Sequence, residues 1–418
     1  MSDYHNKKVE LLAPAGSLEK LEFAIHYGAD ALYLGGEQFG LRERAGNFSF
    51  AEMEQAVAFS HERGAKVYVA TNIIPHESDL VELPNYLRRI AEIGVDAIIA
   101  ADPGVIETSM HVAPKLDIHL STQASVTNWR TVKMWEGLGV KRVVLARELS
   151  LEEIAEIKAR TNVEIEVFVH GAVCNSYSGR CLLSNHMTDR DANRGGCAQS
   201  CRWYYDLYQG LSGDSTALFA ESDVPYTMSS KDLLMVDRIG DLIDLGVDSL
   251  KIEGRMKSIH YVATITSAYR RAIDLYNSGK ANPAELSRLR AEISKASHRP
   301  LFRGFYDGQP GVDAQIYGKE PVLRKYDFVG QVLKYDAGAG IATVQQRNNF
   351  KLGDEIAFYG PQTDFKQVIE QLADSEGNPL MVAPHPLEIV TIKVKSAVKP
   401  YDMLRKLSSL ISHNEFTE

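Results

Sequence analysis

Apolar runs and glycines alternate in a weak repeat along the first 255 residues. In each unit an amphipathic stretch ends at a glycine, and a short run of mostly apolar residues follows within a few positions. Such units begin at Tyr27, Arg63, Ile93, Leu138 and Leu245. Because glycine readily takes the left-handed backbone conformation that ends a helix, each unit predicts a helix followed by a buried strand.

Together with the other apolar runs, these units give eight predicted strands that alternate with helices. Their ranges are Val9–Leu12, Ala31–Leu34, Lys66–Thr71, Ala97–Ala101, Asp117–Ser121, Arg142–Ala146, Glu164–Val169 and Ser249–Ile252. Ser17 is placed to cap a helix over Leu18–Tyr27, and Ser49 with Glu52 and Ser150 with Glu153 have capping-box spacing. The order predicts an α/β fold, a (β/α)8 TIM-like barrel. An open doubly wound sheet is the alternative, but no G-x-G-x-x-G turn follows the first strand.

The repeat is interrupted between the seventh and eighth strands by a cysteine-rich loop, residues 170–226. This loop contains all four cysteines of the chain, Cys174, Cys181, Cys197 and Cys201. Because it follows a strand, we expect it on the carboxyl-terminal face of the barrel, where enzymes of this architecture have their active sites. Residues 1–298 are therefore assigned to a barrel domain with this insertion.

The pattern changes after the eighth strand. Helices are predicted over Tyr261–Ser278 and Ala284–Ser297, and residues 299–321, rich in turn formers, are interpreted as a linker that could pack on the barrel. From residue 322 to residue 418 the chain has short β-type runs at Phe328–Tyr335, Ile341–Gln345, Glu355–Tyr359 and Leu387–Val394. They predict a small C-terminal antiparallel β-barrel domain, a kind of module that often grips RNA.

Composition excludes several classes of protein. No apolar run is long enough for a membrane helix, and the N-terminus lacks the apolar core of a signal peptide, so a cytoplasmic location is expected. The net charge of −9 argues against strong non-specific binding of nucleic acid over the whole surface. Two local basic patches remain candidates, and a solvated face is the alternative for both. Their members are Arg180, Arg190, Arg194 and Arg202, and Lys393, Lys395, Lys399, Arg405 and Lys406.

The cysteines have the spacing C-x6-C-x15-C-x3-C. In a cytoplasmic protein, clustered cysteines are more often metal ligands or redox groups than disulfides. Structural zinc normally uses two close pairs, whereas here Cys174 and Cys181 are far apart in sequence. Wide spacing in a glycine-rich loop favours an iron–sulfur cluster held by four thiolates. Zinc, disulfides and unligated thiols remain alternatives.

Polar residues at the predicted strand ends would line the same face. They are Arg42, Arg44, Asn72, Asp102, Gln123, Arg147, Glu148, His170, Lys251, Glu253 and Arg255. Several arginines around one cavity fit a substrate that bears carboxylates or phosphates, because guanidinium binds these groups bidentately. Ion pairs, such as Arg147 with Glu148 or Glu253 with Arg255, are the alternative. His170 could equally be a core histidine bonded to a backbone carbonyl.

Four segments resemble peptidase family U32. Residues 166–184 read EVFVHGAVCNSYSGRCLLS, and residues 196–202 (GCAQSCR) and 248–258 (DSLKIEGRMKS) are similar to the other shared segments, as is the opening LLAPAG at 11–16. The resemblance spans the barrel, and the appended β-domain resembles that of one branch of the family. No H-E-x-x-H or G-x-S-x-G motif is present, so the residues themselves do not support peptide hydrolysis.

The resemblance implies an activity other than proteolysis. Members of this branch are understood to hydroxylate the wobble uridine of tRNA at C5, with prephenate as cosubstrate and an iron–sulfur cluster. It also implies that Cys174, Cys181, Cys197 and Cys201 bind a 4Fe–4S cluster.

We therefore expect a tRNA-modifying enzyme with Arg42, Arg147, His170, Lys251, Glu253 and Arg255 as substrate-binding residues. A collagenase-like peptidase and a zinc-stabilised RNA-binding or assembly protein are the alternatives. The partners expected are tRNA and prephenate, and the resemblance leaves open a requirement for a partner protein or a paralogue.

Overall fold

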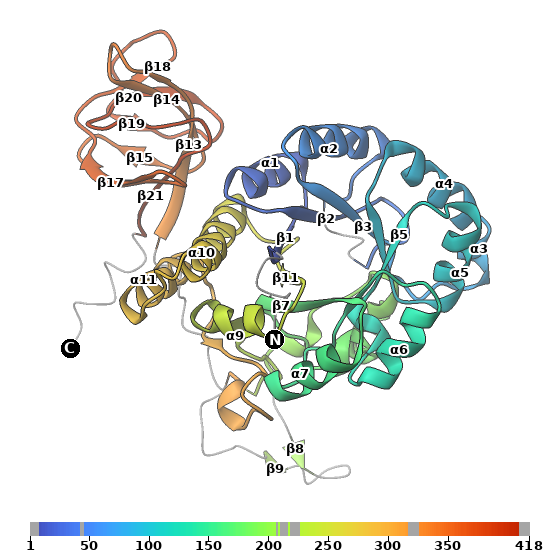
Figure 1. The fold of residues 1–418 in the computed structure, drawn as a ribbon. Helices are drawn as coiled ribbons and strands as arrows, with labels where there is room; N and C mark the ends of the chain where they lie inside the picture. Colours follow the sequence, from blue (N-terminus) through green and yellow to red (C-terminus); the bar gives the residue numbers. More distant parts are fainter. Residues whose placement is uncertain are drawn as a thin grey trace.

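Two sheets organise the chain (Figure 1). The structure is a computed structural model that describes residues 8–41, 46–205, 226–316 and 326–408, and also the backbone of the short strands β8 (Tyr208–Gln209) and β9 (Thr216–Ala217). A ten-stranded sheet forms the N-terminal part and a seven-stranded antiparallel sheet the C-terminal part. Among the described residues, no helix combines the length and the apolar character that crossing a membrane requires.

Eight strands of the first sheet close into a parallel barrel. They are β1 (Glu10–Pro14), β2 (Ala31–Gly35), β3 (Lys66–Ala70), β4 (Ala97–Ala100), β5 (Asp117–Leu120), β6 (Arg142–Val144), β7 (Glu164–Ala172) and β11 (Ser249–Ile252). Each strand pairs in parallel with the next, and β11 pairs with both β7 and β1, which closes the ring. The predicted (β/α)8 barrel is confirmed, with the strand ends shifted by one to three residues.

Helices surround the barrel as the repeat predicts. They are α1 (Leu18–His26), α2 (Phe50–Glu62), α3 (Glu77–Leu80), α4 (Leu83–Ile93), α5 (Pro103–Val112), α6 (Trp129–Gly137), α7 (Leu151–Arg160), α9 (Ile239–Asp244), α10 (Ile259–Asn277) and α11 (Pro283–Ser294). Ser49 and Ser150 make the predicted capping boxes, and the Ser17 hydroxyl accepts a hydrogen bond from the Lys20 amide. The repeat glycines have the positive φ that the helix ends require, at Gly28, Gly64, Gly94, Gly139 and Gly246.

The core has two parts. The larger fills the space between the strands and the surrounding helices, and the smaller lies inside the ring of strands and includes Leu12, Tyr33, Tyr68 and Ile99. Charged side chains also point into the ring, which is unusual for strands that are otherwise fully buried. Some of these side chains form ion pairs directly next to the candidate site.

The predicted linker continues the barrel sheet. Strand β10 (Asp232–Leu234) pairs antiparallel with the end of β7, and β12 (Leu301–Phe302) pairs with β10. The hydroxyl of Tyr306 donates a hydrogen bond of 2.5 Å to the backbone carbonyl of Phe168 in β7. The start of residues 299–321 therefore packs on the barrel, while the predicted boundary at residue 322 lies outside the described residues.

The C-terminal sheet is antiparallel, as predicted. Its order is β17-β16-β21-β13-β14-β20-β18. The strands are β13 (Tyr326–Asp336), β14 (Ile341–Gln346), β16 (Glu355–Gly360), β17 (Thr363–Val368), β18 (Leu372–Asp374), β20 (Ile389–Lys393) and β21 (Met403–Leu407), and a separate pair joins β15 (Phe350–Lys351) to β19 (Val382–Ala383). Its own apolar core includes Val344, Phe358 and Val390.

The β-domain packs against α1, α10 and α11 (Figure 1). The Tyr27 hydroxyl of α1 donates hydrogen bonds of 3.0 Å to the carbonyls of Tyr359 and Tyr401. Arg405 of β21, which is 1% exposed, forms an ion pair with Glu292 of α11. Buried contacts of this kind fix the orientation of the two domains.

Candidate active site at the mouth of the barrel

The cysteine-rich loop folds into short turns after β7. These are η3 (Tyr177–Gly179), α8 (Leu183–Thr188), η4 (Ala192–Arg194) and η5 (Ser200–Arg202). All four cysteines are free thiols; Cys174 is exposed and the other three are partly buried. A loop with so little regular structure depends on side-chain bonds to hold its shape.

Three such bonds fasten the loop to the carboxyl ends of the barrel strands. Glu148, just after β6, accepts hydrogen bonds from both the amide and the hydroxyl of Ser178. Arg180 donates to the carbonyl of Gln123 after β5, at 3.1 Å. Arg194 forms an ion pair with Asp79 of α3. The loop therefore covers the predicted catalytic face.

Asn193 holds the backbone around Cys181. Its side-chain oxygen accepts from the Cys181 amide at 3.2 Å, and its side-chain nitrogen donates to the Cys181 carbonyl at 3.1 Å. The Leu183 amide donates to the sulfur of Cys181 at 3.3 Å. Hydrogen bonds to cysteine sulfur stabilise a thiolate, and they are one of the means by which proteins tune iron–sulfur clusters.

A cavity of about 170 Å³ opens between the loop and the barrel. Its lining includes Cys174, Cys181 and Cys197 together with Arg147, Lys251, Glu253 and Arg255. Cys201 lies within electrostatic range of the other three thiols. Burial raises the pKa of the Cys201 thiol and the three thiols raise it further, while the Arg202 guanidinium opposes them. The structure thus brings the sulfurs and the basic side chains to one rim.

Aromatic rings fix the cations of the cavity. The Arg147 guanidinium lies over the Phe168 ring at 3.7 Å, and the Lys251 ammonium lies 4.6 Å from the centre of the Tyr33 ring. Stacking on a ring leaves the in-plane N–H groups of an arginine available to a second, anionic partner. Arg255 donates to the side chain of Asn47 at 2.8 Å, and Tyr33 donates to Glu253 at 3.2 Å.

A buried ionic network lies beneath the cavity. Glu166 is fully buried, with its carboxylate 2.8 Å from Lys251 and 3.1 Å from Arg142. Arg142 also pairs with Glu10 and Glu164. Burial alone would raise the pKa of Glu166, but Lys251 and Arg142 outweigh it and hold that pKa below its ordinary value. The ion pair with Glu166 holds Lys251 at the floor of the cavity.

Two of the predicted substrate-binding residues are not placed in the cavity. Arg42, like Arg44, lies outside the described residues. His170 is 1% exposed and does not line the cavity; its Nδ1 is 3.4 Å from the Tyr269 hydroxyl, and its ring lies between those of Tyr261 and Tyr269. Burial, with a smaller effect of Lys257, lowers the pKa of His170 to about 3. His170 occupies the position of a neutral core histidine.

The other predicted strand-end residues divide into two groups. Asn72 and Gln123 line the cavity and are joined by a hydrogen bond of 2.7 Å. Asp102 instead caps α5 by accepting from the Gly104 amide, and Glu148 binds Ser178. Sequence reasoning missed Glu166, Tyr33 and Phe168. The signal for Glu166 was available: a carboxylate inside an apolar parallel strand requires a buried partner.

The four cysteines can be compared with the requirements of a zinc site and of an iron–sulfur cluster. Among the described residues, no three His, Cys, Asp or Glu side chains converge tightly enough to hold a single metal ion. A structural zinc site places four donors around one ion. In an iron–sulfur cluster the four cysteines bind different irons, so their sulfurs surround a volume. Three free thiols that line one cavity, with Cys201 in electrostatic range of them, fit that group.

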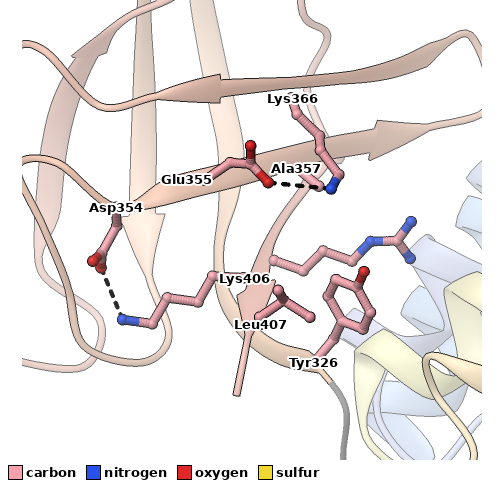
Figure 2. A pocket seen from close by; sticks show the side chains of 8 residues that line it. Tyr326, Asp354, Glu355, Ala357, Lys366, Lys406 and Leu407 are labelled. Atoms are coloured by element: carbon pink, nitrogen blue, oxygen red, sulfur yellow. Dashed lines mark hydrogen bonds and ion pairs between the residues drawn. The ribbon is translucent and has the colours of Figure 1, made fainter. Parts of the chain in front are cut away.

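A second pocket, also of about 170 Å³, lies on the β-domain (Figure 2). Its lysines are neutralised by acidic neighbours: Lys366 lies 3.1 Å from Glu355, and Lys406 lies 2.8 Å from Asp354. With Arg405 engaged by Glu292, two of the five residues of the predicted C-terminal basic patch, Arg405 and Lys406, are in ion pairs. The pocket therefore offers an anion little net attraction.

Comparison with known families agrees with this architecture. Residues 16–316 match the model described as peptidase family U32, and residues 324–405 match that of the peptidase family U32 C-terminal domain. The chain belongs to peptidase family U32. The resemblance seen in the sequence segments is thereby confirmed.

Curated relatives of this U32 chain carry names of two kinds. tRNA hydroxylation protein P1 of Bacillus subtilis is 50% identical over 401 residues, covering 96% of this chain and 95% of that protein. The 23S rRNA 5-hydroxycytidine synthase of Escherichia coli is 38% identical over 302 residues, 72% of this chain and 45% of that protein. Collagenase of Porphyromonas gingivalis is 32% identical over 411 residues, 94% of this chain and 97% of that protein.

Proposed function

We propose that this chain is an RNA-hydroxylating enzyme of the U32 family that makes 5-hydroxyuridine at the wobble position of tRNA, with prephenate as cosubstrate and a 4Fe–4S cluster. The observation that carries the proposal is the shared cavity, in which cysteines Cys174, Cys181 and Cys197 face Arg147, Lys251 and Arg255. The relatives named for tRNA and rRNA hydroxylation support the reaction class.

The cations of the cavity suit a small dicarboxylate. Prephenate carries two carboxylates, and guanidinium groups bind carboxylates through paired, charge-assisted hydrogen bonds. Arg147 is oriented by Phe168, and Lys251 is held by Glu166 at the floor. These residues would bind and orient the cosubstrate between the barrel and the loop.

The cysteines would hold the cluster at the outer wall of the same cavity. A cluster bound there would supply one-electron chemistry next to the cosubstrate. Glu148, Asn193 and Arg180 fix the loop, so the sulfurs keep their positions relative to the barrel.

The collagenase relative favours peptide hydrolysis as a second candidate. Hydrolysis needs a base beside a nucleophile or beside a metal-bound water. The described lining of the cavity includes no histidine, and the buried His170 is not part of that lining. The residues therefore support the RNA-modifying reaction better than proteolysis.

Nucleoside mass spectrometry of tRNA tests the proposal. A strain that lacks this gene and any paralogue should lose 5-hydroxyuridine and the nucleosides derived from it. The wild-type gene should restore them, and a Cys181→Ala gene should not. Unchanged nucleosides in the deletion strain would refute the function.

A further inference from the structure

Exposed aromatic side chains gather on the cysteine-rich loop. Of the four Phe, Tyr or Trp residues classed as largely exposed in the described part of the chain, three lie there: Tyr177 at 56%, Trp203 at 42% and Tyr204 at 51%. Leu182 and Met187 are exposed on the same loop. An apolar cluster of this kind on a protein surface marks an interaction site.

The backbone that carries these rings is held in place. The Trp203 amide donates to the Ser200 carbonyl at 3.0 Å, and the backbones of Tyr205 and Tyr226 exchange hydrogen bonds in a bridge. Tyr177 precedes Ser178, which Glu148 fastens to the barrel. A rigid ring loses little conformational entropy when a flat partner stacks on it.

The rings also adjoin the cavity. Tyr177 is two residues from Gly179 and Leu182 is next to Cys181, and Gly179 and Cys181 both line the cavity. Helix α8 contacts η5, and the Ser184 and Ser200 hydroxyls lie 3.3 Å apart, which brings the Trp203 end of the loop to the same side. The aromatic cluster therefore borders the mouth through which a substrate base would enter.

We infer that Tyr177, Trp203 and Tyr204 form a stacking surface for unpaired bases of the RNA loop that carries the target nucleotide. The inference rests on the proposed function and identifies the part of the protein that grips the RNA. Unpaired bases in loops stack on aromatic side chains, and this is the usual way in which proteins recognise single-stranded RNA.

Local charge on the loop, and not the net charge of the chain, favours an RNA occupant. The net charge of −9 makes phosphate attraction over the whole surface weak. Around the rings, however, the loop has Arg180, Arg190 and Arg202, which suit phosphates next to the stacked bases.

Binding of a labelled RNA to the anaerobically purified holoprotein tests the inference. The probe is a fluorescein-labelled anticodon stem-loop with uridine at the wobble position, and the reference is a duplex of equal length. We expect the stem-loop to bind more tightly. Trp203→Ala and Tyr177→Ala should each weaken stem-loop binding by about tenfold, the loss expected for one base–aromatic stack. Trp203→Phe should retain most of the affinity.

The dependence of RNA affinity on salt concentration distinguishes base stacking from phosphate contacts. Trp203→Ala should keep the wild-type slope of log affinity against log salt concentration, whereas Arg190→Ala should reduce it by roughly 0.7–0.9. Leu138→Ala is the matched control, since Leu138 is 55% exposed at the end of α6, on the opposite rim, and should bind as wild type. Iron content per chain shows that each variant retains the folded loop.

The outcomes distinguish the two proposals. Wild-type affinity in both Trp203→Ala and Tyr177→Ala would overturn the stacking surface and assign the cluster to a protein partner. The proposed function would survive that result as long as the deletion strain loses 5-hydroxyuridine. Failure of the wild-type holoprotein to bind the stem-loop would also overturn the stacking surface, whereas the proposed function is overturned by unchanged nucleosides in the deletion strain.

Discussion

The carboxylate of Glu166 lies 2.8 Å from the ammonium group of Lys251, and both side chains are buried inside the ring of strands. Glu166 comes from β7 and Lys251 from β11, the two strands whose pairing closes the barrel. Lys251 also lines the cavity. The ion pair between Glu166 and Lys251 therefore joins the two strands that close the barrel, and it also holds Lys251 at the floor of the cavity.

Replacing Glu166 by glutamine should destabilise the fold strongly. The substitution leaves Lys251 and Arg142 buried without their shared carboxylate, and loss of one partner of a buried pair costs about 3–5 kcal/mol. Urea unfolding of the Glu166→Gln variant measures the loss. Glu156→Gln is the control, because its ion pair with Arg160 is about half exposed and should contribute less than about 1 kcal/mol.

The difference in stability between wild type and Glu166→Gln should also depend on pH. Because the folded-state pKa of Glu166 lies below its ordinary value of 4.5, its contribution is fully present above that value and is lost as the pH falls through the folded pKa. The difference in unfolding free energy between wild type and Glu166→Gln should therefore shrink in acid. A difference that stays constant from neutral pH to acid would contradict the assignment.

Gly35→Ala should disturb the cavity without removing a charged residue. A Cβ at Gly35 would lie 2.4 Å from the Nη2 of Arg255, so the guanidinium must move. We expect prephenate binding, measured by calorimetry, to weaken at least tenfold. The substitution should lower the free energy of unfolding by no more than about 3 kcal/mol. Gly137→Ala is the control, because no atom lies within 4 Å of its added Cβ. Equal prephenate affinity in both variants would remove Arg255 from the site.

Much of the barrel could be predicted because its signals are local. A glycine that ends a helix and an apolar run are both short-range features; five of the eight strands follow such a glycine, and the other three were found from their apolar runs. Strands β10 and β12 were missed because two or three residues carry no periodicity, and their pairing with the end of β7 is a tertiary contact. Strand β21 was missed because Arg405 and Lys406 make it look polar, although Arg405 is buried against Glu292.

His170 shows why the site was harder to predict than the fold. The sequence indicated that the seventh strand ends at Val169, which would put the next side chain on the rim. Strand β7 instead continues to Ala172, and β10 pairs with this extension, so His170 is enclosed by Tyr261 and Tyr269. An extension stabilised by a distant strand leaves no mark in the local sequence.

Glu148→Ala should loosen the cysteine-rich loop. Glu148 accepts two hydrogen bonds from Ser178, and without them the turn between Cys174 and Cys181 loses its attachment to the barrel. We expect the variant to release iron to a chelator several times faster than wild type. Glu156→Ala, on the neighbouring helix α7, should release it at the wild-type rate. Identical rates in Glu148→Ala and wild type would show that the loop does not depend on this anchor.

The two domains should separate when their buried ion pair is broken. Glu292→Gln leaves Arg405 without its carboxylate at the domain interface and should cost about 3–5 kcal/mol. Asp364→Asn is the matched control, since Asp364 pairs with Arg288 across the same boundary but both side chains are more than half exposed. Scanning calorimetry should show a lowered or split transition for the first variant alone. A single unshifted transition would contradict a fixed interface.

Counting iron, acid-labile sulfide and zinc in anaerobically purified protein tests the central claim most directly. The account predicts iron and sulfide in equal amounts, about four of each per chain for a 4Fe–4S cluster, and their loss when Cys174, Cys181, Cys197 or Cys201 is changed to alanine. Stoichiometric zinc without iron or sulfide, or iron that survives all four substitutions, would contradict it.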